Sequence, residues 1–176
     1  ASRVFNENHV DYSLRHGKRD GAFCSTPLPQ ITPFVLINYT GKSRDVFTLA
    51  HEIGHAVHSV AASHKSILVS DAPLPLAETA STYSELLLYD NISSQISDTE
   101  KSTILSDKID DFYATIGRQS FFTLFEIEAH NEIANSITVD DISKIYRNNL
   151  KEQFGSSIDI SEDFGIEWSC IPHFYH

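Results

Sequence analysis

One short motif restricts this chain more than any other feature of its sequence: two histidines four residues apart, the first followed directly by a glutamate. These are His51, Glu52 and His55. On a helix each residue advances by about 100°, so the two histidines lie about 40° apart and one turn along, and both imidazoles can reach one zinc ion. Glu52 can face a water molecule on that metal without displacing it. The motif therefore predicts a helix that holds zinc for hydrolysis.

The residues around the motif support this helix. Asp45 or Ser43 is able to cap its N-terminus, and the helix is expected to end after Ser59. Apolar residues recur with a period of about 3.6, which is typical of a helix with one face against a core. These apolar residues are Val46, Leu49, Ile53, Ala56, Val57 and Val60.

A catalytic zinc site takes three protein ligands and keeps a fourth position open, so one ligand must come from elsewhere. His58 shares a side of the helix with His51 but lies about 10.5 Å further along the axis, which is too far for one ion. We therefore expect His58 to support or pack against the site rather than to bind metal. Some zinc peptidases use a histidine ten residues after the first, but here that position is Ala61.

The next predicted helix, from about Pro75 to Asp90, offers two acidic candidates, Glu78 and Glu85. They are seven residues apart and share one face, about 10.5 Å apart along the axis. Small residues flank Glu78 and would let the two helices approach closely. Glu85 is able to accept a hydrogen bond from a ligand histidine. The spacing favours Glu78 as the third ligand only slightly and leaves Glu85 open.

The rest of the chain predicts a mainly α fold with a small β-sheet or hairpin. Residues 1–19 are polar and mixed. Strand-forming residues predict extended segments at 21–24 and 34–39. Helical periods and caps predict helices at 98–134 and at 140–155, and a short helix in the tail from residue 161. Asp140 or Asp141 is expected to begin the second of these helices. Gly117 lies inside the longest helix and allows a kink there.

Several predictions concern regions away from the motif. The segment 34–39 either offers a strand edge to an extended peptide or is ordinary sheet core. Arg118 and Glu126 share a helix face without touching, and His130, one turn beyond Glu126, is expected to pair with it. We expect structural roles for all three. The aromatic residues expected in the core are Phe121, Phe122 and Phe125.

Composition limits the partners of the chain. Its 176 residues contain 13 Lys and Arg against 24 Asp and Glu, a formal charge of −11. We expect no nucleic-acid or anionic-membrane partner, because the charge that neutralises phosphates is missing. The chain also has no apolar run of about 18 residues that would predict a membrane span. Cys24 and Cys170 are expected to be reduced thiols, as in a cytoplasmic protein. The chain starts at Ala1 and lacks methionine, so we interpret it as a processed or truncated piece without a signal peptide.

Longer stretches resemble a known family. They are residues 17–24, 33–41, 45–55 and 75–81, the pairs Arg118-Gln119 and Phe125-Glu126, and Trp168 with residues 171–175. Together they resemble the oligoendopeptidase F branch of the thimet-oligopeptidase-like metallopeptidases over nearly the whole chain. The resemblance implies a zincin-type (gluzincin) helical catalytic core. It also implies that residues 1–176 are a single fragment of a larger peptidase, without its N-terminal helical part and C-terminal end.

The resemblance also implies residue roles. His51, His55 and Glu78 match the family's ligands for one Zn²⁺ per chain, and Glu52 matches the general base that activates a zinc-bound water. His173 matches a histidine near the substrate carbonyl oxygen. The implied function is a zinc-dependent endopeptidase that hydrolyses internal peptide bonds of short oligopeptides.

Two other functions fit the same residues. A truncated fragment can bind zinc and peptide without turnover, since the family's substrate-binding tyrosines follow further along than Tyr175 and the chain stops at His176. Alternatively, the zinc is structural, in which case four protein ligands would close the site. Replacing Glu52 by Gln separates these functions, because only a peptidase would lose cleavage while keeping its zinc.

Overall fold

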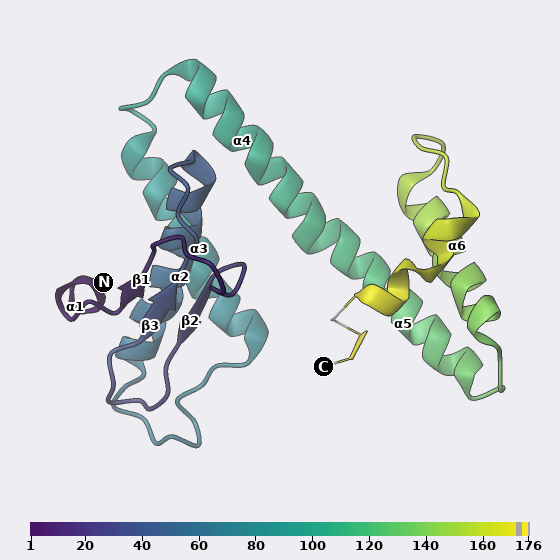
Figure 1. Cartoon of the computed structure of the whole chain (residues 1–176), viewed down its shortest axis with the longest axis horizontal. Helices are drawn as coiled ribbons and strands as arrows, with labels where there is room; N and C mark the ends of the chain where they lie inside the picture. The colour runs from purple at the N-terminus through teal and green to yellow at the C-terminus, as the bar shows by residue number, and fades with distance from the viewer. Residues whose placement is uncertain (172–173, 176) are drawn as a thin grey trace. The chain divides into compact units, whose positions relative to one another are not determined.

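The computed structural model describes residues 1–171 and 174–175 (Figure 1). It divides into two compact units, Ala1–Leu105 and Ser106–His176, which are described separately. Helices dominate both units, and strands occur only in the first among the described residues. The prediction of a mainly α fold with a small sheet is therefore confirmed. None of the helices in the described part of the chain combines the length and apolarity that a membrane span needs.

The first unit opens with a short helix and a three-stranded sheet. Helix α1 (Ser2–Asn6) precedes strands β1 (Val10–Asp11), β2 (Phe23–Ser25) and β3 (Phe34–Leu36). The strand order is β1-β3-β2, with β1 parallel and β2 antiparallel to β3. The segment 34–39 therefore supplies the central strand. Of the two alternatives for it, sheet core is confirmed and a free edge for a peptide is wrong, because β3 is paired on both sides. Residues 1–19 form α1 and β1, which the polar sequence did not predict.

The motif helix is α2 (Ser43–Ala61), as expected, and its start differs slightly from the prediction. Lys42, rather than Ser43 or Asp45, is the N-cap residue. The Asp45 carboxylate, in the first turn, accepts the backbone N–H groups of Thr40 at 2.6 Å and Lys42 at 3.1 Å. The inner face of α2 packs on the sheet through Ala56, with Leu49 and Ile53 beside it.

Helix α3 (Leu74–Ile92) packs tightly against α2 at one glycine. A Cβ atom at Gly54 would lie 2.6 Å from Ser84 Oγ, 2.7 Å from the Ala80 carbonyl oxygen and 2.7 Å from Ser81 Cα. No side chain fits at those distances, so the two helix backbones approach more closely than any residue but glycine allows. The expected close approach of these helices is confirmed.

The long predicted helix is present in three continuous parts. Helix α4 (Asp98–Phe112) is followed without a break by the π-helical segment η1 (Tyr113–Arg118) and by α5 (Gln119–Ile133). The irregularity expected at Gly117 thus takes the form of π-helical turns, which are common where a helix deviates from its regular hydrogen bonding. The aromatic ring of Tyr113 covers the glycine at 3.2 Å from an ideal Cβ position.

The second unit is built around aromatic rings. Helix α6 (Val139–Phe154) starts at Thr138, whose hydroxyl accepts the Asp141 N–H, and the 3₁₀ segment η2 (Glu162–Cys170) follows. The cap therefore precedes the two aspartates expected to open this helix. The predicted core position of Phe122 and Phe125 is confirmed, and Phe121 is half-buried. The buried core comprises Phe122, Phe125, Ala129, Ile142, Tyr146, Leu150, Ile160 and Ile171.

Polar contacts on the second unit agree with two of the expectations from sequence. His130 and Glu126 approach to 3.9 Å on the exposed side of α5. Arg118 does not contact Glu126; it pairs with Glu167 at 3.4 Å.

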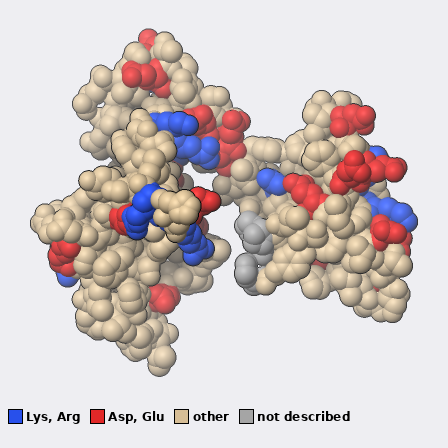
Figure 2. Space-filling view, in the orientation of Figure 1, with Lys and Arg blue, Asp and Glu red and all other residues tan. Residues whose placement is uncertain are grey.

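Acidic side chains are spread over the visible face of the molecule with basic ones between them, without a basic patch in that view (Figure 2).

Candidate metal centre

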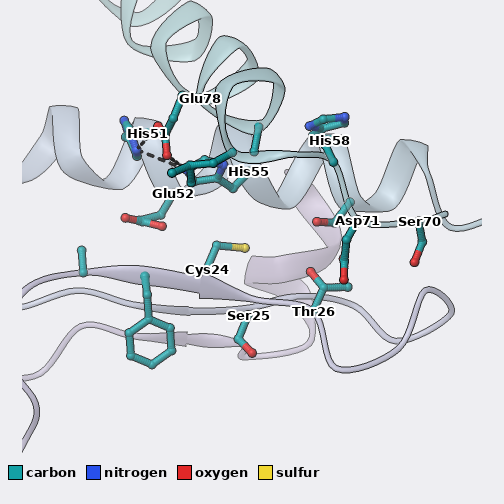
Figure 3. Close-up of a pocket in the computed structure, with 16 residues that line it drawn as sticks. Cys24, Ser25, Thr26, His51, Glu52, His55, His58, Ser70, Asp71 and Glu78 are labelled. Carbon is teal, nitrogen blue, oxygen red and sulfur yellow. Dashed lines mark hydrogen bonds and ion pairs between the residues drawn. The ribbon is translucent and has the colours of Figure 1, made fainter. Parts of the chain in front are cut away.

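Three side chains from α2 and α3 converge at the predicted site (Figure 3). The Nε2 atoms of His51 and His55 are 3.2 Å apart. The Glu78 carboxylate reaches both rings, with Oε2 3.2 Å from His51 Nε2 and Oε1 3.7 Å from His55 Nε2. Two nitrogens and one carboxylate oxygen therefore lie within 4.8 Å of one another, a grouping able to hold a metal ion.

The separations fit a tetrahedral zinc site. With bonds of about 2.1 Å, two ligands of a tetrahedral ion lie about 3.4 Å apart, close to the 3.2 Å between the His51 and His55 nitrogens. Imidazole nitrogen and carboxylate oxygen are the donors that zinc takes in catalytic sites. Within the described residues this group contains three donors, which leaves one tetrahedral position open.

Glu85 contacts the ring of His51 at the nitrogen that faces away from Glu78. Its carboxylate lies 2.7 Å from His51 Nδ1. Nδ1 donates to this carboxylate, which leaves the lone pair of Nε2 directed at Glu78 and His55. This hydrogen bond is the main cause that raises the pKa of His51 above its ordinary value. The geometry thus separates the two acidic candidates: Glu78 meets both Nε2 atoms, and Glu85 contacts the other side of one ring.

Glu78 is itself held by a neighbour. The hydroxyl of Ser81, which is completely buried, donates to Glu78 Oε2 at 2.8 Å. The hydroxyl also lies 3.0 Å from the backbone carbonyl oxygen of Glu78. A buried donor on the next turn of α3 therefore restricts the carboxylate to the orientation that meets the two histidines.

Glu52 is buried beside this group, on the face of α2 toward the sheet. Only 7% of its surface is exposed. Burial raises the pKa of its carboxyl, and the nearby Glu78 raises it further while His51 lowers it. Across the gap, the Cys24 thiol of β2 points toward α2, and burial together with the charge of Glu52 raises its pKa to about 11 (Figure 3). Cys24 is therefore a neutral thiol at pH 7.

One cavity of about 610 Å³ is lined by the three converging side chains together with Glu52 and Cys24. Its floor is β2 with the residues on either side, and its roof is α2, α3 and the loop between them (Figure 3). His58 also lines the cavity but is not part of the converging group, in line with the distance argument from sequence. The lining residues are Ala22 to Thr26, His51, Glu52, His55, His58, Ser59, Ser70 to Ala72, Leu74, Ala77 and Glu78.

Sequence reasoning missed some of the residues that line the cavity. Cys24, Thr26 and Asp71 face the cavity, but no spacing rule singled them out; only Cys24 belonged to a stretch with family resemblance. His173 lies outside the described residues, so its predicted contact with substrate stays a prediction. Tyr175 is described and is exposed.

The whole chain, residues 1–176, matches the sequence model of peptidase family M3. The chromosomal oligoendopeptidase F of Lactococcus lactis subsp. cremoris is 32% identical over 177 residues, covering 98% of this chain and 29% of the relative. The oligopeptidase PepF of Bacillus subtilis is 33% identical over 171 residues, covering 95% of this chain and 25% of the relative.

The structure of this chain also matches a solved structure of a protein with a similar name. Oligoendopeptidase F from Enterococcus faecium matches with a TM-score of 0.59 and 31% identity, covering 76% of this chain and 24% of that chain. The expected fold of a metallopeptidase catalytic core is therefore confirmed, and the chain spans less than a third of the proteins it matches. The match of the family's sequence model extends over every residue, so this chain belongs to peptidase family M3.

Proposed function

We propose that this chain forms the catalytic core of a zinc-dependent endopeptidase that hydrolyses internal peptide bonds of short oligopeptides. The observation that carries the proposal is the convergence of His51, His55 and Glu78 beside the buried Glu52 in one open cavity. The names of the relatives, oligoendopeptidase F and oligopeptidase, support the same substrate class.

His51, His55 and Glu78 would hold the zinc. A bound Zn²⁺ supplies a Lewis acid that polarises the scissile carbonyl and acidifies water. Glu85 and Ser81 act on the ligands, by fixing the His51 ring and the Glu78 carboxylate.

Glu52 moves the proton. Its carboxylate takes a proton from the water that attacks the carbonyl carbon, and later delivers that proton to the nitrogen of the departing amine as the C–N bond breaks. A carboxyl whose pKa is raised by burial suits this role, because it binds the proton strongly enough to hold it between the two steps. His173 is proposed, from the family resemblance, to contact the carbonyl oxygen.

The strand β2 is the proposed substrate guide. In the sheet of described residues β2 pairs with β3 on one side only, and its residues line the cavity below Glu52. An extended peptide can therefore add to this edge by main-chain hydrogen bonds, which would align its backbone without regard to its side chains. This edge replaces the segment 34–39 as the peptide-binding strand.

The test compares the zinc-loaded protein with its Glu52→Gln variant on a quenched fluorescent peptide. We expect the variant to bind one zinc per chain while cleavage falls by at least about a hundredfold, since general acid–base catalysis contributes that much or more. Glu126→Gln, the same change on an exposed helix face, is the control and should cleave normally. Unimpaired cleavage by the Glu52→Gln variant would refute the role of Glu52.

A second function is favoured by the length of the chain. Because it covers 29% of a relative such as oligoendopeptidase F, the chain alone could bind zinc and peptide without turnover. The complete natural protein and this chain should then both bind zinc, and only the complete protein should cleave. A structural zinc would need a fourth protein donor, which the group of three described donors lacks.

A further inference from the structure

The cavity wall carries carboxylates but no lysine or arginine among the described residues that line it. Two of these carboxylates already have a proposed role, Glu78 as a zinc ligand and Glu52 as the proton acceptor. Asp71 is the third, and it comes from the loop between α2 and α3. It is exposed and, within the described part of the chain, has no hydrogen bond or ion pair to another residue.

We propose that Asp71 forms an acidic subsite that recognises a lysine or arginine side chain of the peptide substrate. This inference rests on the proposed peptidase function and names the substrates that the site prefers. It adds a specificity-determining residue to the cavity, separate from the residues that would carry the chemistry.

The position of Asp71 supports a subsite rather than a part of the metal centre. Figure 3 shows the cavity running along β2, with Glu52 and Glu78 toward one end, Cys24 between, and Asp71 beside Thr26 at the other end. Thr26, Ser70 and Asp71 also line a second, small depression. Their hydroxyl and carboxylate oxygens are all acceptors for an ammonium or guanidinium group.

Charge favours a cation at this end. A bound Zn²⁺ would add two positive charges at the ligand end, where the carboxylates of Glu78 and Glu52 would balance them. No lysine or arginine offsets Asp71 along the described wall, whose basic groups are the imidazoles of His51, His55 and His58, so its carboxylate faces no permanent positive charge there. A peptide that lies along β2 from the scissile bond toward Thr26 brings a neighbouring side chain to this carboxylate, because side chains of an extended peptide alternate every residue.

The size of the effect follows from exposure. Asp71 is exposed at one end of the cavity, so a new ion pair there loses little solvation and gains modest Coulomb energy in water. We expect kcat/KM to be about 1.5- to fivefold higher for lysine than for an uncharged side chain of equal length, which is the range of exposed ion pairs. Added salt should reduce this difference.

The experiment uses the complete natural protein, loaded with zinc, and short quenched peptides in which lysine, norleucine or glutamate is placed at each position in turn. At one position the wild type should prefer lysine over norleucine. Asp71→Asn should abolish that preference while leaving cleavage of the norleucine peptide unchanged, and Asp71→Lys should prefer glutamate instead. Asp90→Asn, at an exposed aspartate of α3 that does not line this cavity, should leave the preference intact.

Binding provides a second measurement that does not need turnover. The same peptides are titrated into the Glu52→Gln variant, with and without Asp71→Asn. If the lysine peptide binds more tightly than the norleucine peptide only when Asp71 is present, the acidic subsite is supported. If, in addition, the wild type cleaves no peptide, the proposed peptidase function fails while the subsite stands. Equal lysine preference with and without Asp71, or an equal loss for every peptide in Asp71→Asn, would overturn the inference.

Discussion

The helix pair of the first unit and the core of the second show two different ways of packing. Where α2 meets α3, the contact is made by Gly54, Ala80 and Ser81, and polar side chains are gathered beside it. In the second unit, rings fill the interior: Phe125 lies edge to face with Tyr146 at 4.9 Å between centroids and with Phe174 at 5.2 Å. Small residues bring backbones together, and rings fill space between them.

The difference teaches where function and stability reside. Both regions contain a hydrogen-bonded carboxylate, 2.7 Å from His51 to Glu85 and 2.8 Å from Tyr146 to Glu167. In the first unit that bond leaves a reactive nitrogen facing a cavity. In the second it satisfies a phenol whose ring is completely buried, and burial, followed by this bond, raises the pKa of Tyr146. Substitutions in the first region should therefore mainly lower zinc affinity, and substitutions in the second should mainly lower the free energy of unfolding.

The largest effect is expected from Phe125→Ala. This side chain is 2% exposed and lies against three other rings in the aromatic core, those of Tyr146, Trp168 and Phe174. Its removal should lower the free energy of unfolding by about 3–5 kcal/mol, the usual cost of deleting a buried phenylalanine. Chemical denaturation measures this change. Zinc stoichiometry below the unfolding transition should stay at one per chain; a loss of zinc without a loss of stability would contradict the comparison.

Gly54→Ala should weaken zinc binding, which Phe125→Ala leaves intact, and should cost less stability than Phe125→Ala. The new methyl group would lie 2.6–2.7 Å from atoms of α3, two of them backbone atoms, so the helices must separate. We expect a loss of about 1–3 kcal/mol in unfolding free energy, with weaker zinc binding because ligand distances tolerate only about 0.2 Å.

The same substitution at a second helical glycine is the control. At Gly117 the nearest atoms to a new methyl are those of the Tyr113 ring, at 3.2 Å, and a side chain can shift. Gly117→Ala should therefore change stability by no more than about 1 kcal/mol, since alanine favours helix. Calorimetry and zinc titration on both variants provide the comparison. Equal effects at the two glycines would show that helix propensity, rather than close packing, explains Gly54.

The first region was more readily predicted from sequence than the second. Helical spacing alone placed His51 and His55 together, because residues four apart on a helix share a face. It did not separate Glu78 from Glu85, since that choice depends on how α3 is positioned along α2, a tertiary property. In the second unit the core phenylalanines were predictable, but the partner of Arg118 was not, because Glu167 lies 49 residues away in sequence.

The small sheet was the weakest prediction. Strand β1 has two residues in a polar stretch, too short for any alternating pattern. Its pairing with β3 depends on contacts across more than twenty residues. The error about the free edge follows directly: without β1, the segment 34–39 has an open side, and β2 is not recognised as the strand that faces the cavity.

Glu85→Gln tests whether the carboxylate that hydrogen-bonds His51 increases the affinity of the site for zinc. An amide keeps the shape of the carboxylate but lacks its charge, so we expect zinc affinity to fall by about 10- to 100-fold, as for other groups that orient ligand histidines. Competition with a chelator measures the affinity. Glu126→Gln should leave it unchanged, and an unchanged affinity in Glu85→Gln would refute the positioning role.

The same variant has an expected pH dependence without metal. Because Glu85 raises the pKa of His51 in the folded protein, protonated His51 stabilises the metal-free fold. That stabilisation is present below the unfolded pKa of about 6.5 and is lost as pH rises through the higher folded pKa. The stability difference between wild type and Glu85→Gln should therefore grow as pH falls toward 6 and shrink at alkaline pH; the opposite trend would contradict the assignment.

The smallest effect is expected from His130→Ala. His130 faces Glu126 at 3.9 Å one turn away, and its side chain is 74% exposed. Water and salt screen such a pair, so the coupling measured by a double-mutant cycle with Glu126 should be at most about 0.5 kcal/mol. The corresponding cycle for His51 and Glu85 should give a larger coupling, because that pair is shorter and partly buried. Equal couplings would mean that burial does not distinguish the two regions, since both pairs join an imidazole to a carboxylate.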